Sequence, residues 1–172
     1  MEPVQDEVDI VIAADGDSVL KIESLAKEIW TEHYASIISR EQIEYMLSNL
    51  QSFEAIEKQI DEGYMYYLVI DKDGKEVGYL AVLQKENEIL LSKIYLKKEH
   101  RRKGYGRQIL EFVFHVAKLN KADRVVLFVN KKNSGSIEVY KKCGFKIVSS
   151  FVTGAGNGFV MDDFKMEKDI YG

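Results

Sequence analysis

Residues 93–107 constrain the fold of this chain more than any other stretch, because a strand-like apolar segment runs directly into a basic turn that opens a helix. From Lys97 to Arg107 there are six lysine or arginine residues and one glutamate, a local charge of +5 with histidine neutral, whereas the whole chain carries −4. Gly104 and Gly106 let the backbone approach a ligand closely. The helix N-terminus adds unpaired N–H groups and the positive end of the helix dipole. We therefore predict a site for a phosphorylated cofactor.

Two common phosphate-binding patterns do not fit this turn. A nucleotide-triphosphate loop requires a Gly-Lys-Ser/Thr ending, and a dinucleotide fingerprint requires a third glycine where this chain has Ile109. The string Arg101-x-x-Gly104-x-Gly106 instead resembles the acetyl-CoA motif Arg/Gln-x-x-Gly-x-Gly/Ala of the GNAT superfamily of N-acetyltransferases. Its place after a strand and at the start of a helix makes this short pattern informative.

A second segment, residues 133–145, resembles another element of the same superfamily, Asn-x-x-Ala-x-x-x-Tyr-x-x-x-Gly-Phe. Asn133, Tyr140 and Gly144 match it, and Ser136 stands where a small alanine is usual. Two motifs in the right order and at the right separation indicate the family together. The resemblance covers roughly residues 75–150 and implies an α/β fold with a mixed, mostly antiparallel sheet flanked by helices.

Composition sets wider bounds. A chain of 172 residues with 46% hydrophobic and 30% charged residues predicts a single globular domain over residues 1–172. The one cysteine, Cys143, leaves no internal disulfide and no metal-ligand spacing, and the histidines are scattered, so we expect no metal. No apolar run approaches the ~20 residues that span a bilayer, and no signal peptide is apparent. We expect a cytoplasmic protein with no membrane partner.

The alternation of strand and helix patterns predicts the order of elements. Predicted helices cover about residues 18–33, 39–49, 52–63, 104–119 and 134–142. Ser39 with Gln42 forms a capping box, and Ser52 is a second candidate cap. Predicted strands cover about residues 8–13, 64–70, 76–84, 88–97, 124–129, 146–152 and 159–168, with a hairpin at Asp73-Gly74.

The resemblance implies that acetyl-CoA is the co-substrate and lies in a splay between the strand that ends at Lys97 and the strand 124–129. It assigns cofactor contacts to Ile94, Tyr95, Leu96, Arg101, Arg102, Lys103, Gly104, Tyr105, Gly106, Arg107, Asn133 and Lys142. Tyr140 is the predicted proton donor to the departing thiolate, because a phenol of pKa near ~10 is protonated at pH 7. Asn133 as a simple helix cap, and Tyr140 as a packed ring, are the structural alternatives.

The acceptor side is less constrained by the sequence. An alkyl ammonium must lose a proton before it attacks, and Glu88 is the first candidate for the base, ahead of Glu86, although an exposed strand carboxylate is the alternative. Trp30, His33 and Tyr34 are candidate acceptor-binding residues. The tail 156–166 resembles the C-terminal strand of bacterial GNAT proteins of the polyamine-acetyltransferase type, and its paired carboxylates, Asp162 and Asp163, suit a cationic amine or form a solvated strand edge.

The sequence thus predicts an acetyl-CoA-dependent N-acetyltransferase that acts by direct attack in a ternary complex, on a polyamine or another small cationic amine. A protein or peptide N-acetyltransferase and a non-catalytic acyl-CoA sensor are the alternatives. A nucleic-acid-binding role for the basic turn would require aromatic stacking residues and a basic domain, whereas the pI is about 5.5. We expect no nucleic-acid partner, and the strand 159–168 offers an edge for a homodimer.

Overall fold

The computed structural model describes residues 6–171. The chain divides into two compact units, which are described in turn. The first unit holds the residues up to 82 together with 93–109, and the second holds 83–92 together with those from 110 onwards. The single domain expected over the whole chain stays a prediction.

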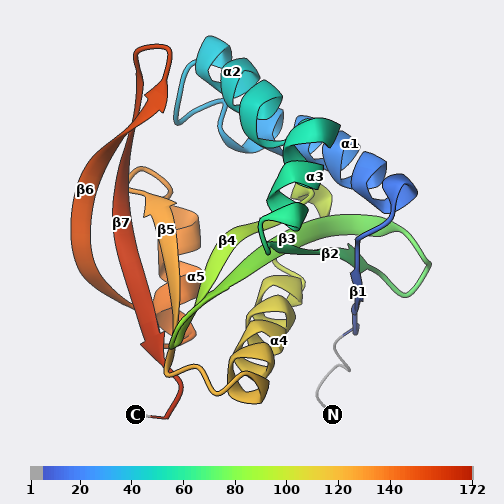
Figure 1. The fold of residues 1–172 in the computed structure, drawn as a ribbon, viewed down its shortest axis with the longest axis vertical. Coiled ribbons are helices and arrows are strands. Elements are labelled where there is room, and N and C mark those ends of the chain that lie inside the picture. The colour runs from blue at the N-terminus through green and yellow to red at the C-terminus, as the bar shows by residue number, and fades with distance from the viewer. Residues whose placement is uncertain (1–5, 172) are drawn as a thin grey trace. The chain divides into compact units, whose positions relative to one another are not determined.

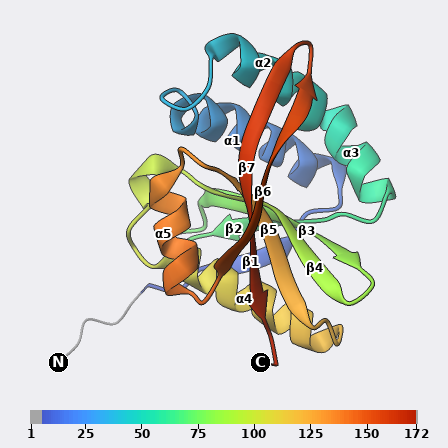
Figure 2. The same cartoon turned by 90° about the vertical axis from the view of Figure 1, so that its left-hand side faces the viewer.

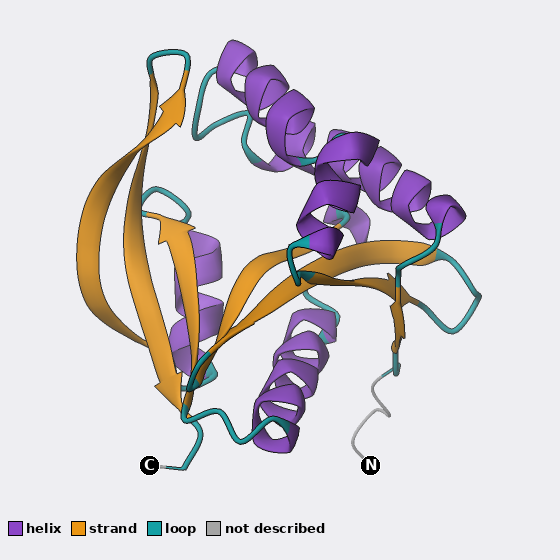
Figure 3. Cartoon of the chain, viewed as in Figure 1, coloured by secondary structure: helices purple, strands orange, loops and turns teal. Residues whose placement is uncertain are grey.

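The helices and strands follow the predicted order closely (Figure 3). The helices are α1 (Gly16–His33), α2 (Arg40–Leu50), α3 (Phe53–Asp61), the short 3-10 helix η1 (Lys98–His100), α4 (Tyr105–Leu119) and α5 (Ser134–Lys142). The strands are β1 (Asp9–Ile12), β2 (Met65–Ile70), β3 (Glu76–Lys85), β4 (Glu88–Leu96), β5 (Arg124–Asn130), β6 (Lys146–Gly156) and β7 (Phe159–Asp169). The predicted α/β fold with a mixed, mostly antiparallel sheet and flanking helices is confirmed.

In the first unit, helices α1, α2 and α3 contact one another and lie over one face of strands β2 and β3 (Figure 1). Each helix begins at a polar side chain that accepts a hydrogen bond from a backbone N–H three residues later, namely at Asp15, Ser39 and Ser52. The predicted caps at Ser39 and Ser52 are therefore confirmed. These bonds satisfy donors that the first helical turn leaves unpaired.

Strands β1, β2 and β3 of this unit pair antiparallel in sequence order. Their inward residues form a core with the helices, in which Ile22, Ile29, Ile56 and Leu80 have exposed fractions of 0–1%. This continuous apolar interior fixes the positions of α1 and of the strands that carry the polar residues described below.

In the second unit, β4 pairs parallel with β5, β5 pairs antiparallel with β7, and β7 pairs antiparallel with β6. Strands β6 and β7 form a long twisted hairpin, which Figure 2 shows end to end. Strand β6 continues to Gly156, beyond the predicted end near Val152, because it pairs with the start of β7 up to Phe159. Short-range composition gives no signal for this extension, since Gly154 and Gly156 are typical of turns.

The position of β7 corrects one expectation about assembly. The strand 159–168 was predicted to be an edge strand, but β7 lies between β5 and β6, and β6 occupies the edge. The hairpin places the later strand inside because β7, not β6, has the partner β5. Any pairing of two copies through this part of the sheet would therefore use β6. Among the described residues, no helix has the length and apolar character to cross a membrane.

Candidate functional site

The basic turn has the backbone shape that an anion site requires. After η1 the backbone enters the left-handed region twice, at Arg102 with φ of 64° and at Gly104 with φ of 83°, and α4 begins at the next residue, Tyr105. A side chain added at Gly104 would be strained by this φ. At Gly106 an added Cβ would meet no atom within 4 Å, so there is open space beside this residue in the first turn of α4. The predicted turn-and-helix geometry is present.

The basic side chains of the turn divide into two groups. Arg102, Lys103 and Arg107 are exposed, whereas Arg101 is half-buried. The Arg101 guanidinium contacts Glu32 in the last turn of α1, with Nη2 at 2.6 Å from Oε1 and Nη1 at 3.2 Å from Oε2. Its Nε donates to the carbonyl of Leu96 at 3.1 Å. The three nitrogens of the Arg101 guanidinium thus all contact protein oxygens.

The aromatic residues predicted for the acceptor do gather at one place in the first unit. The Trp30 and Tyr34 rings lie 5.4 Å and 6.2 Å from the Tyr95 ring, and the Tyr34 and Tyr95 hydroxyls are hydrogen-bonded at 2.8 Å. The His33 ring meets the Tyr34 ring edge-on at 4.9 Å. Burial lowers the pKa of His33, and the nearby Arg101 lowers it further. The structure brings these residues together, and their role toward an acceptor stays a prediction.

A series of hydrogen bonds between largely buried polar groups continues from this cluster. The sequence analysis did not predict this series. The Trp30 indole N–H donates to the Tyr79 hydroxyl at 2.9 Å, and Tyr79 donates to Gln51 Oε1 at 2.6 Å. Gln51 Nε2 donates to the Tyr66 hydroxyl at 3.1 Å, and Tyr66 donates to Gln59. Every donor in this series meets an acceptor, so the polar groups are compatible with a packed interior.

Lys93 lies at the end of this series of hydrogen bonds, and the sequence analysis did not predict a role for it. Its Nζ lies 3.4 Å from Gln59 Oε1 and 5.5 Å and 5.8 Å from the Tyr64 and Tyr66 ring centres. Burial lowers the pKa of Lys93 to about 8. The strand period offered a signal, because Lys93 lies on the same face of β4 as the buried Leu91 and as Tyr95.

Strand β4 carries the backbone predicted to pair with the pantetheine arm, Ile94 to Leu96. Its parallel ladder with β5 runs from Glu88–Arg124 to Leu91–Leu127, and β4 then continues to Leu96. The last part of the strand lies very close to β3, because a Cβ built on Gly78 would be only 2.3 Å from the carbonyl oxygen of Tyr95. This close approach fixes the segment that leads into the basic turn.

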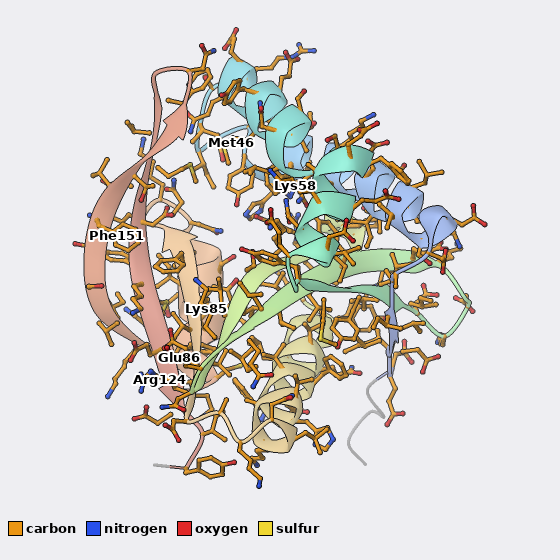
Figure 4. All side chains as sticks on the ribbon, viewed as in Figure 1. Met46, Lys58, Lys85, Glu86, Arg124 and Phe151 are labelled. Atoms are coloured by element: carbon orange, nitrogen blue, oxygen red, sulfur yellow. The ribbon has the colours of Figure 1, made fainter. Side chains whose placement is uncertain are left out.

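The predicted base, Glu88, lies in the second unit at the beginning of β4. Its carboxylate accepts a hydrogen bond from Arg124 Nε at 3.0 Å, and the two residues are register partners. Figure 4 labels Arg124, at the start of β5, near the turn residue Glu86. The role of Glu88 as base stays a prediction.

The residues of the second motif form helix α5 of the second unit and the turns at its two ends. Asn133 is the N-cap and accepts from the Ser136 N–H at 3.4 Å, and the Phe145 N–H donates back to the Tyr140 carbonyl at 3.0 Å. The Phe145 ring meets the Tyr140 ring edge-on at 5.8 Å, and 9% of Tyr140 is exposed. Lys142 is exposed in the last turn. The cap is confirmed, and the contacts of these residues with a cofactor stay predictions.

The two carboxylates of β7 differ in their surroundings. Asp162 is exposed and forms an ion pair with Lys131 at 2.8 Å. Asp163 is half-buried, its Oδ1 is buried, and no described group forms a hydrogen bond with that atom. Burial raises the pKa of Asp163, the neighbouring Asp162 raises it further, and Lys131 lowers it. A buried carboxylate oxygen without a hydrogen bond is energetically costly unless it gains a partner.

Comparison with known proteins places this chain in a family. The family model described as the acetyltransferase (GNAT) family matches residues 22–145, which is more than half of the chain. The chain therefore belongs to the GNAT family, as its two motifs indicated. The spermidine N(1)-acetyltransferase of Thermoplasma acidophilum is 27% identical over 152 residues, which cover 84% of this chain and 92% of that protein.

Solved structures show the same fold. The crystal structure of the PaiA N-acetyltransferase from Thermoplasma acidophilum in complex with coenzyme A has a TM-score of 0.80 at 24% identity, over 95% of this chain and 99% of that one. A spermidine N-acetyltransferase SpeG chimera from Vibrio cholerae and hSSAT has a TM-score of 0.71 at 17% identity, over 95% of each chain.

Proposed function

We propose that this protein transfers the acetyl group of acetyl-CoA to a primary amine, with a polyamine or similar small cationic amine as the acceptor. The observation that carries the first part is the turn before α4, where left-handed backbone at Arg102 and Gly104 precedes a helix N-terminus. Exposed basic residues, including Arg107, surround it. These features fit a pyrophosphate, which binds well to helix N-termini and to arginine. The coenzyme A complex of a structural relative supports the same ligand.

Acetyl-CoA would supply an acetyl group activated as a thioester, and the chain would orient it and manage protons. The backbone of residues 94–96 would align the pantetheine arm as an added strand. Tyr140 would donate its hydroxyl proton to the departing thiolate as the acceptor nitrogen attacks in a ternary complex. Glu88 is our proposed base, and it would have to exchange its bond with Arg124 for a contact with the acceptor or a bridging water.

The second part of the proposal, the cationic acceptor, rests on Asp163. Its buried Oδ1 forms no hydrogen bond with any described group, and a substrate ammonium would supply the missing donor. The spermidine acetyltransferase relative supports this class of acceptor. Because the raised pKa of Asp163 brings its protonation to higher pH, we expect affinity for cationic acceptors to fall, as pH decreases, earlier than an ordinary aspartate would predict.

Calorimetry and a thiol-release assay test the two parts separately. Wild-type protein should bind acetyl-CoA, and Gly104→Glu should abolish binding, because it puts a strained, negative residue in the turn. Tyr140→Phe should lower kcat about 100-fold, within the usual range for a general acid, while still binding acetyl-CoA. If the protein binds acetyl-CoA but releases no thiol with any amine, and Tyr140→Phe leaves that binding unchanged, the protein is a sensor instead.

The acceptor is tested with spermidine, spermine, amino acids and peptides. Asp163→Asn should raise the KM for spermidine roughly 10- to 100-fold, because a hydrogen bond to a charged group is worth about 1.5–3 kcal/mol. Asp169→Asn, an exposed position further along β7, is the matched control. Turnover of peptides but not polyamines, with no effect of Asp163→Asn, would favour a peptide N-acetyltransferase instead.

A further inference from the structure

Arg101 opens the acetyl-CoA motif, yet its side chain is engaged with protein groups. Each of its three nitrogens contacts a protein oxygen: Nη1 and Nη2 contact the two carboxylate oxygens of Glu32, and Nε contacts the Leu96 carbonyl. About a third of each partner's side chain is exposed, 30% for Arg101 and 36% for Glu32. A two-point arginine–carboxylate contact fixes direction as well as distance.

The contacts of Arg101 link the basic turn to the end of β4 and to the last turn of α1. Leu96 is the last residue of β4, and Glu32 lies in the last turn of α1, beside His33. Lys97, the residue after β4, forms a second ion pair with α1, at 3.3 Å to Glu28. The turn is therefore held to α1 by two glutamates that lie one helical turn apart.

The residue held in this way immediately precedes the strained part of the turn. Arg102 has a φ of 64°, a conformation that costs a non-glycine residue energy and persists only where its surroundings impose it. Fixing Arg101 sets the direction in which the chain enters Arg102, and hence the direction of the N–H groups that follow up to Tyr105. Without the contact between Arg101 and Glu32, these N–H groups would point in more varied directions and would bind an anion less well.

We infer that Glu32 and Arg101 act together as positioning residues, which shape the turn for the pyrophosphate, and that Arg101 is not itself a ligand of the cofactor. The inference rests on the proposed function, because it concerns the seat for acetyl-CoA. It assigns the charge contact with the anion to Arg102, Lys103 and Arg107, which are exposed. It also gives Glu32, which lies 69 residues from Arg101 in sequence, a part in cofactor binding.

Glu32→Gln separates this role from direct binding, because the two predict opposite signs. If Arg101 bound the phosphates, removal of the Glu32 charge would release the guanidinium and strengthen or preserve coenzyme A binding. If the pair positions the turn, Glu32→Gln and Arg101→Gln should each raise the calorimetric Kd for coenzyme A about fivefold, and the double variant should be no weaker than either single variant. Glu32→Asp, which keeps the charge, should restore part of the affinity.

Glu44→Gln is the matched control, because it breaks an exposed Arg40–Glu44 ion pair on helix α2 and should leave the Kd unchanged. Steady-state assays should show a higher KM for acetyl-CoA with an unchanged kcat. Equal or tighter binding by Glu32→Gln, or additive losses in the double variant, would overturn the inference while leaving the proposed function intact. Wild-type protein that fails to bind coenzyme A would overturn both.

Discussion

The hydroxyl oxygens of Tyr34 and Tyr95 lie 2.8 Å apart, and their hydrogen bond joins the C-cap residue of α1 to strand β4. Tyr95 lies in the segment predicted to align the pantetheine arm, and Tyr34 belongs to the predicted acceptor residues. A hydrogen bond thus joins a predicted cofactor residue to a predicted acceptor residue. Trp30 packs against both rings and fixes the geometry of the pair.

We expect Tyr34→Phe and Tyr95→Phe each to lower the free energy of unfolding by about 0.5–1.5 kcal/mol, the usual net value of one hydrogen bond. The double variant should lose little more than either single variant, because both changes remove the same bond. Urea unfolding measures this. Tyr171→Phe, at a ring that is 65% exposed, is the control and should change nothing. Additive losses would mean that the bond does not contribute.

The close approach of β3 to β4 gives a second prediction. An ideal Cβ on Gly78 would lie 2.3 Å from the Tyr95 carbonyl oxygen and 2.9 Å from Leu96 Cδ2, so Gly78→Ala must push β4 away. We expect a loss of about 2–4 kcal/mol in the free energy of unfolding, since neither the backbone nor its neighbours can move cheaply. Weaker binding of acetyl-CoA should accompany this loss, because β4 leads into the basic turn.

Gly154→Ala is the matched control for that variant, because an added Cβ there meets nothing within 4 Å. Its unfolding free energy should stay within about 0.5 kcal/mol of the wild type. Unfolding curves for Gly78→Ala that coincide with those of Gly154→Ala would show that β4 adjusts freely, and that the tight packing at Tyr95 has no energetic consequence.

The sequence predicted best where the signals are local. Ser39 and Gln42 are three residues apart, and the cap between them is found as expected. The basic turn is also local, since its strand, its glycines and its helix follow one another in the chain. Such features depend on backbone geometry over a few residues, which composition and spacing record directly.

The parts that the sequence did not predict depend on which strands and helices are neighbours. The Glu88–Arg124 bond joins residues 36 apart and needs the register of a parallel ladder. The difference between Asp162 and Asp163 appears only once Lys131 is placed beside one of them. Alternation along a strand shows which face a residue takes, but it does not identify the partners on that face.

Lys93 provides the last prediction, on stability and pH. The ammonium of Lys93 lies over the Tyr64 and Tyr66 rings, which hold it only partly against the cost of burial. The net result is the lowered pKa of about 8.

The sign of the effect follows from the two states of the protein. Below pH 8 both the folded and unfolded proteins keep Lys93 protonated, and the folded state carries the full cost of the buried charge. Between about pH 8 and the unfolded pKa of 10.5, the unfolded state binds more protons, so the contribution of Lys93 to stability rises with pH. Lys93→Met, which removes the charge, should therefore stabilise the protein at pH 7, by on the order of 1–3 kcal/mol.

That advantage over the wild type should shrink as the pH is raised from 8 to 10, which urea unfolding at a series of pH values would measure. Lys97→Met is the control, because Lys97 forms an ion pair with Glu28 and its loss should not stabilise the fold. A Lys93→Met protein that is less stable than the wild type at pH 7, or whose advantage does not depend on pH, would show that the tyrosine rings and Gln59 compensate the buried charge completely.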